Sequence, residues 1–81
     1  MAASRADVDR WIESAIAAEC EFIVSVCDTF DMDDYPVYCK DKNDLILTYD
    51  RYDNDDWNKI NEIIQIIDGV AIENLKIHQI I

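Results

Sequence analysis

Residues 4–30 read Ser-Arg-Ala-Asp-Val-Asp-Arg-Trp-Ile-Glu-Ser-Ala-Ile-Ala-Ala-Glu-Cys-Glu-Phe-Ile-Val-Ser-Val-Cys-Asp-Thr-Phe, and the conformation of this stretch decides the architecture. Ser4 followed three positions later by Asp7 is typical of a capping box at a helix start. Apolar residues then recur with helical spacing on one side of a wheel, at Val8, Trp11, Ile12, Ala15, Ile16, Phe22, Ile23, Val26 and Phe30. We therefore expect one long N-terminal helix from about residue 5 to residue 28.

Two features of the same stretch argue against an uninterrupted helix. Residues 22–27 are rich in β-branched types, which also suit a strand. Glu19 would lie near the centre of the apolar face of the helix. A helix is the preferred interpretation, and a strand at 22–27 stays open.

The segment that follows is expected to form a β-hairpin. Tyr35 precedes Pro36, and a residue before proline is pushed out of the α region into an extended conformation. Residues 37–39 suit a short strand, residues 41–44 a turn, and residues 45–49 a second strand.

The last third predicts a second helix and a final strand. Residues 53–56 (Asp-Asn-Asp-Asp) resemble a helix start, where carboxylates accept hydrogen bonds from free amides and suit the helix dipole. Asp68-Gly69 would end this helix, and residues 72–81 would form a strand. The apolar face of the helix would consist of Trp57, Ile60, Ile63, Ile64 and Ile67. The chain is thus expected to be one α+β domain over residues 1–81, ordered α-β-β-α-β, with a small antiparallel or mixed sheet packed on helices.

The charge of the chain restricts its partners. The formal net charge is −11, and residues 28–56 alone carry −7. Direct binding to nucleic acid or to an anionic membrane is not expected, because both need Lys and Arg to neutralise phosphate. The complementary partner is a basic protein surface, such as that of a nucleic-acid-binding enzyme. Acidity that serves only solubility is the competing interpretation.

The sequence offers little for catalysis or metal binding. The chain has three cysteines, Cys20, Cys27 and Cys39, and this odd number favours a reducing, cytoplasmic location. Their spacing does not match a metal site. His78 is the only histidine, and the chain has no glycine-rich phosphate loop. Neither Asp-rich segment has the glycine or glutamate of a calcium-binding loop. We expect no enzyme activity, cofactor or metal.

The acidic middle of the chain also contains aromatic residues. Carboxylates can replace phosphates opposite Arg or Lys, while Tyr and Trp supply contact area at low entropy cost. The same aspartates also suit helix caps and turns, where Asp is favoured in any case. The candidate partner-binding residues are Asp31, Asp33, Asp34, Tyr35, Asp50, Tyr52, Asp53, Asp55, Asp56 and Trp57.

In size, acidity and lack of a catalytic motif, the chain resembles small phage-encoded inhibitors: anti-CRISPR proteins, anti-restriction DNA mimics and uracil-glycosylase inhibitors. It is also similar to toxin and bacteriocin immunity proteins. The resemblance lies in composition over the whole chain, so it transfers no residue roles. It implies a protein, acting in the cytoplasm of a host cell, that inhibits a defence enzyme by occupying its basic nucleic-acid channel.

Two alternatives remain beside the inhibitor hypothesis. An antitoxin or immunity protein would use the same kind of surface on a different partner. A self-assembling module would instead pair Trp11 and Ile12 of the first helix with a second copy, and the sequence leaves such a homodimer open.

Overall fold

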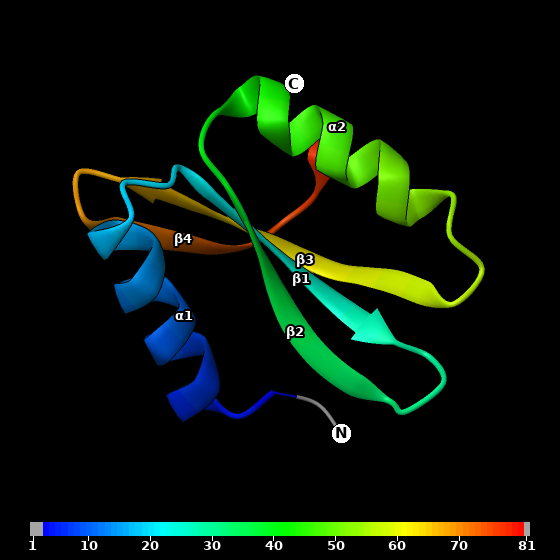
Figure 1. The fold of residues 1–81 in the computed structure, drawn as a ribbon. Coiled ribbons are helices and arrows are strands. Elements are labelled where there is room, and N and C mark those ends of the chain that lie inside the picture. The colour runs from blue at the N-terminus through cyan, green and yellow to red at the C-terminus, as the bar shows by residue number, and fades with distance from the viewer. Residues whose placement is uncertain (1–2, 81) are drawn as a thin grey trace.

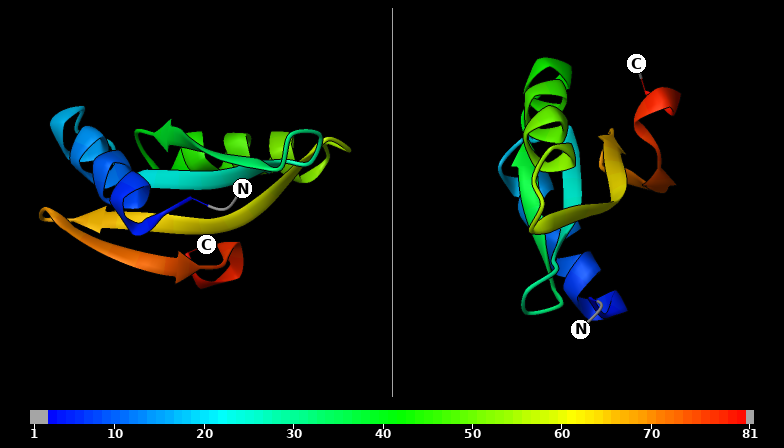
Figure 2. Two further views of the ribbon diagram at one scale, coloured as in Figure 1. Left: turned by 90° about the horizontal axis from the view of Figure 1, so that it is seen from below. Right: turned by 90° about the vertical axis from the view of Figure 1, so that its right-hand side faces the viewer.

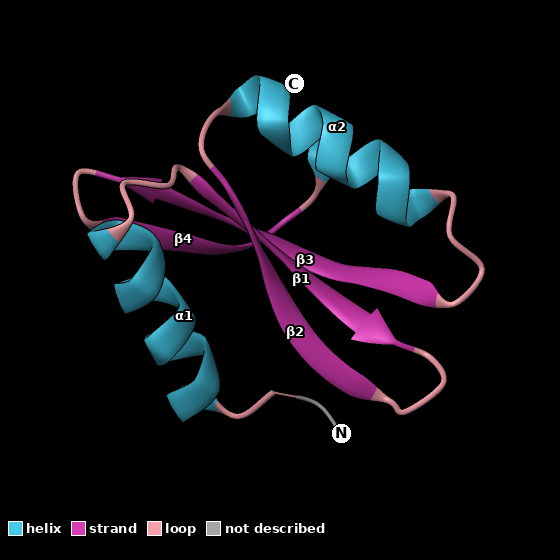
Figure 3. Ribbon diagram, viewed as in Figure 1, coloured by secondary structure: helices cyan, strands magenta, loops and turns pink. Residues whose placement is uncertain are grey.

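A computed structural model describes residues 3–80 and shows two helices and a four-stranded antiparallel sheet (Figure 1; Figure 3). The α+β class is confirmed, with the order α-β-β-α-β-β. The elements are α1 (Arg5–Ala17), β1 (Phe22–Asp28), β2 (Asp33–Cys39), α2 (Lys42–Asp53), β3 (Asn58–Ile67), β4 (Val70–Leu75) and the short 3₁₀ helix η1 (Ile77–Gln79). Neither α-helix in the described part has the length and hydropathy needed to cross a membrane.

The sheet has the strand order β2-β1-β3-β4, so β1 and β3 are its central strands. The two helices lie on opposite faces of the twisted sheet (Figure 2). On the α2 side the core contains Phe22, Val24, Val26, Cys39, Leu45 and Ile63. On the α1 side it contains Ala15, Cys20, Ile23 and Ile64, against which Trp11 and Ile12 pack.

The first helix is shorter than the sequence predicts. Ser4 caps it with the expected capping box to Asp7, but the helix ends at Ala17 and Glu19 takes a left-handed φ of 59°. Glu19 therefore marks the end of the helix and is exposed, instead of lying within its apolar face. The expectation of a helix at 22–28 is wrong, and the strand alternative at 22–27 is confirmed. A strand buried on both faces has a continuous apolar sequence, which mimics a buried helix.

Residues 45–49 are helical, which contradicts the predicted second hairpin strand. Asp41 is the N-cap of α2, and its side chain accepts a hydrogen bond from the Asp44 amide at 2.8 Å. Leu45, Tyr49 and Tyr52 recur at helical spacing and face the sheet. The turn-like composition of residues 41–44 thus starts a helix, because Asp is favoured equally in turns and at N-caps.

The predicted second helix is also wrong, because residues 58–67 form the strand β3. Residues 53–56 lie at the end of α2 and in the loop after it, not at a helix start. A register shift between β1 and β3 places Ser25 opposite Glu62 and Val26 opposite Ile60. The extra residue of this bulge lets Ile60 and Ile63 pack on the same core cluster. The three-residue spacing of Ile60 and Ile63 therefore resembles the spacing on one face of a helix.

The end of the chain is partly as expected. The strand predicted at 72–81 corresponds to β4, which begins at Val70 and ends at Leu75, and η1 follows; residue 81 lies outside the described range. Asp68 and Gly69 have φ values of 50° and 77° and form the two-residue turn that joins β3 to β4. Two successive residues with positive φ match the twist of a hairpin, so the Asp-Gly pair reverses a strand instead of ending a helix.

Candidate functional site

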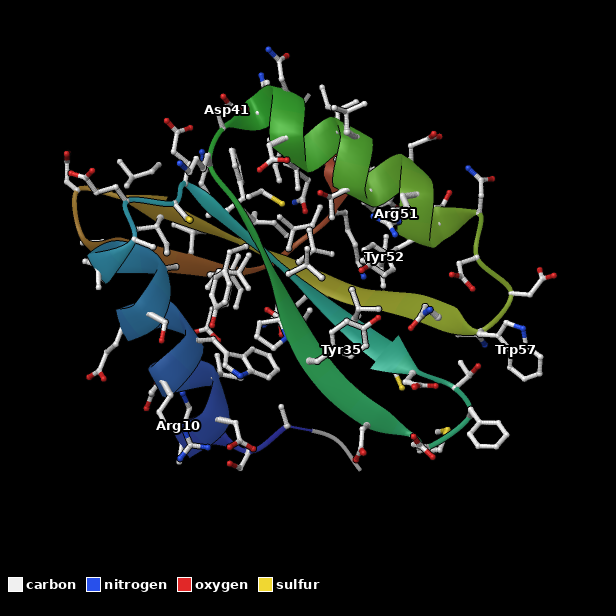
Figure 4. The ribbon with its side chains drawn as sticks, viewed as in Figure 1. Arg10, Tyr35, Asp41, Arg51, Tyr52 and Trp57 are labelled. Atoms are coloured by element: carbon white, nitrogen blue, oxygen red, sulfur yellow. The ribbon has the colours of Figure 1, made fainter. Side chains whose placement is uncertain are left out.

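The β1–β2 turn and the α2–β3 loop meet at one end of the sheet. The Thr29 amide and Oγ1 both donate to the Trp57 carbonyl oxygen, at 2.9 and 2.8 Å. The rings of Phe30 and Trp57 lie edge to face with centroids 6.3 Å apart. Phe30 is 77% exposed and Trp57 64% exposed, so both rings project from the molecule; Figure 4 shows Trp57 at this end. We call these two residues the aromatic tip.

Two aspartates shape the loops that carry the aromatic tip. Asp28 Oδ1 accepts a hydrogen bond from the Phe30 amide at 2.9 Å. Asp55 Oδ1 accepts one from the Trp57 amide at 2.8 Å. Each is a local turn of the type that Asp side chains favour. The roles of Asp28 and Asp55 are therefore at least partly structural.

Other aspartates at this end are exposed. Asp31 lies in the β1–β2 turn and Asp33 at the start of β2, while Asp53 and Asp56 lie at and beyond the end of α2. Within residues 3–80, the side chains of Asp31, Asp53 and Asp56 make no hydrogen bond or ion pair. We call Asp31, Asp33, Asp53 and Asp56 the acidic rim.

The position of Asp53 matters for interpreting the acidic rim. Asp53 is the last residue of α2, whose C-terminal end carries the negative pole of the helix dipole. A carboxylate at this end destabilises the helix instead of capping it. The capping explanation of the aspartates therefore holds for Asp41 but fails for Asp53.

Tyr35 and Tyr52 pack α2 against the sheet next to the site. Both are half-buried between β2 and α2, with ring centroids 6.3 Å apart, and Figure 4 shows them pointing toward one another. The Tyr35 hydroxyl donates to Asn58 Oδ1 at 2.8 Å. Burial, reinforced by Tyr52 and nearby carboxylates, raises the pKa of Tyr35 to about 12. Arg51 lies 5.8 Å from the centre of the Tyr52 ring. These tyrosines hold α2 on the sheet and are not exposed anchors.

Asp34 does not belong to the acidic rim. It faces the α1 side of the sheet, where it accepts hydrogen bonds from the Ala3 amide at 2.8 Å and from Asn61 Nδ2 at 3.0 Å. Its neighbour across the strands is Cys27, and burial followed by the Asp34 carboxylate raises the pKa of that thiol. The structure thus separates Asp34 from the other candidate residues.

An open groove of about 280 Å³ lies between α2 and η1. Ile46, Tyr49 and Ile77 form its apolar lining, and Asp50 and Asp53 place carboxylates along it. An arginine or lysine side chain has the matching chemistry, with an aliphatic stem and a cationic head. Asp53 belongs to both the groove and the acidic rim, so the two features form one continuous surface.

Sequence reasoning missed Phe30 and the groove. Phe30 was assigned to the apolar face of a long helix, although its neighbours Asp28 and Asp31 are a signal for an exposed turn. Ile77 lies far from α2 in the sequence, and no local pattern predicts that the chain returns to it. The groove exists because the apolar side of η1 packs back on the α2-side core.

Among residues 3–80, no three His, Cys, Asp or Glu side chains are placed to hold a metal ion together. The three cysteines are free thiols. Burial raises the pKa of Cys39, which keeps this thiol in its protonated, less nucleophilic form.

No protein-family model, curated protein sequence or solved structure matches the chain.

Proposed function

We propose that the chain is a non-catalytic binding protein whose acidic rim and aromatic tip occupy a basic surface on a nucleic-acid-binding enzyme, in the manner of an anti-CRISPR inhibitor. One observation carries the proposal. Asp53 stands at the end of a helix where its charge is unfavourable, and the two rings of the aromatic tip are more exposed than buried. The charge of Asp53 and the exposure of the two rings do not benefit the isolated fold, whereas both suit a partner.

The chemistry of the surface matches a nucleic-acid channel. Such channels combine cationic groups for the backbone with aromatic or apolar surfaces on which bases stack. The acidic rim presents carboxylates that replace phosphates opposite Arg and Lys. Phe30 and Trp57 present flat rings that take the place of bases. The groove beside Asp53 adds a slot for one partner cation.

The energetics of such an interface depend mainly on the aromatic tip. Buried aromatic residues at the centre of an interface carry most of the binding energy, while the charges around them steer association and set specificity. Exposed charges are screened over roughly 8 Å at physiological ionic strength, so association is expected to slow as salt rises. An antitoxin or immunity protein would use this surface in the same way on a toxin, and the identity of the partner separates the two functions.

The test is capture of the partner from the lysate of the host cell, with bound proteins identified by mass spectrometry after low-salt and high-salt washes. The proposal expects a nucleic-acid-binding enzyme that is retained at low salt and displaced by its own nucleic acid. Trp57→Ala should abolish retention, and the triple variant Asp53→Asn, Asp55→Asn, Asp56→Asn should weaken it. Asparagine keeps the Oδ1 acceptor that Asp55 uses toward the Trp57 amide.

The matched control removes the same charge elsewhere. Glu13, Glu19 and Glu21 are exposed near α1, away from the acidic rim, and their joint replacement by Gln should leave retention unchanged. Equal losses of retention from both triple variants would indicate a general effect of net charge and not a specific role of the acidic rim. A partner that nucleic acid does not displace, or that Trp57→Ala still binds, would refute the proposal.

A further inference from the structure

The outer edge of β4 has backbone groups that no neighbouring strand in the sheet satisfies. The Ile66 amide donates to the Glu21 carbonyl at 2.7 Å, so the backbone of Ile66 faces away from β4. Ala71 lies opposite Ile66. Because hydrogen-bonded and non-bonded pairs alternate in an antiparallel ladder, the amide and carbonyl of Ala71 point outward from the sheet. Regular pairing continues to Gln65 and Ile72, so the same alternation along the strand directs the amide of Glu73 outward, immediately before the register shift.

The opposite edge of the sheet is protected against pairing. β2 contains Pro36, which has no amide to donate, and it begins with Asp33 and Asp34. Proline and charged residues are common devices that keep edge strands from associating. β4 has no proline, and its single carboxylate, Glu73, is paired with Arg5 at 2.8 Å. The register between β4 and β3 shifts between Ile63 and Gln65, and Asn74 has a φ of 60°, so the end of β4 is irregular. Residues 70–73 precede this shift and contain neither proline nor an unpaired charge, so this part of β4 is the part of the two edges able to accept a strand.

An apolar patch lies beside this edge. Ile67, Val70 and Ile72 are exposed and share one face of the β3–β4 hairpin, because Ile67 is opposite Val70, and Ile72 is two residues further along the strand. None of the three is charged. An exposed apolar patch next to an unpaired edge strand is typical of an interface or an aggregation site.

We propose that β4 pairs with β4 of a second copy, antiparallel and around a two-fold axis at Ile72. In this register Ala71 of each copy faces Glu73 of the other, so the outward backbone groups of these two residues satisfy one another. Ile72 packs against Ile72 of the second copy, and Val70 and Ile67 extend this contact. No two like charges stand opposite each other across the axis.

Charge complementarity favours a second copy over an unrelated strand. The same register brings Lys76, just beyond β4, to the end of the interface where the Asp68–Gly69 turn of the second copy lies. The β3–β4 turn and Trp57 lie at opposite ends of the molecule, as Figures 1 and 4 show. Pairing through β4 therefore places the two acidic rims far apart, which minimises repulsion between chains of net charge −11. The inference does not depend on the proposed function.

The test is sedimentation equilibrium of the full chain over low-micromolar to near-millimolar concentration. The shared edge is short, so we expect a weak, reversible dimer of the 9.4 kDa chain. Ile72→Lys places like charges on the axis and should weaken dimerisation at least about tenfold. Leu47→Lys, on the exposed side of α2, is the matched control and should leave the dimer unchanged.

A second variant distinguishes loss of the interface from loss of folding. Ala71→Pro removes an outward amide that β3 does not use, so the monomer should keep its circular dichroism spectrum while the dimer is lost. A wild-type chain that stays monomeric at every concentration would overturn the proposal. A dimer that tolerates both Ile72→Lys and Ala71→Pro would also overturn it, because the contact would then lie elsewhere.

Discussion

Phe30 and Trp57 meet edge to face, with ring centroids 6.3 Å apart, although one follows β1 and the other precedes β3. Their backbones are joined in the same place by the two hydrogen bonds from Thr29 to the Trp57 carbonyl. The contact locks two loops into one surface. It also gives the exposed rings a fixed geometry, which would lower the entropy cost of the partner binding proposed above.

The contact between the two rings should be measurable as a coupling energy. Phe30→Ala, Trp57→Ala and the double variant form a cycle whose coupling we expect to be about 0.5–1 kcal/mol in the free energy of unfolding. Urea denaturation followed by circular dichroism measures it. Phe30→Ala with Leu47→Ala is the control cycle and should show no coupling. Strictly additive losses in the first cycle would contradict the ring contact.

The two leucines of α2 should behave differently. Leu45 is fully buried against the sheet, whereas Leu47 is 72% exposed. Leu45→Ala should therefore lower the free energy of unfolding by about 2–5 kcal/mol, the range found for buried leucines. Leu47→Ala should change it by less than about 0.5 kcal/mol. Similar losses at both positions in chemical denaturation would contradict the orientation of the helix.

The N-cap of α2 should be worth a measurable amount of stability. Asp41→Ala removes the acceptor of the Asp44 amide and should cost about 1 kcal/mol. Asp41→Asn keeps a side-chain oxygen at the same place and should cost much less. Thermal unfolding of the two variants beside the wild type gives the comparison. An alanine variant as stable as the asparagine variant would contradict the N-cap role of Asp41.

Tyr35 should ionise late and make the fold sensitive to alkali. Its pKa is raised from 10.0 to about 12 in the folded chain, so the unfolded chain releases this proton first as pH rises. Stability is therefore fully present below pH 10 and is lost as pH rises toward 12. Absorbance titration near 295 nm should show a tyrosinate phase at about pH 12 that Tyr35→Phe removes. If the late phase survives in Tyr35→Phe, another tyrosine is responsible.

Some elements of the fold followed from local sequence. The start of α1 was predicted because the Ser4 and Asp7 side chains satisfy helix amides within a few residues of themselves. The extended segment around Pro36 was predicted because proline restricts the residue before it. Both signals act over neighbouring residues, so no distant partner is needed to interpret them.

Other segments were misassigned because their apolar side chains pack on both faces of the sheet. Residues 22–28 and 58–67 are central strands with apolar side chains on both sides, and the bulge opposite Ser25 gives Ile60 and Ile63 a helical spacing. Periodicity alone cannot separate such a strand from a buried helix. Leu45 shows the reverse case, since residues 45–49 contain types that suit a strand but form a helix behind the Asp41 cap.

By itself the sequence determined the α+β class, the beginning of α1 and the concentration of negative charge in residues 28–56, because composition and local capping depend on nothing distant. Tertiary structure decided that residues 22–28 and 58–67 became strands and residues 45–49 a helix, since a strand is stable only when neighbouring strands complete its hydrogen bonds. It also decided the candidate site. Phe30 and Trp57 become one surface only after β1 and β3 pair and bring their loops to the same end of the sheet.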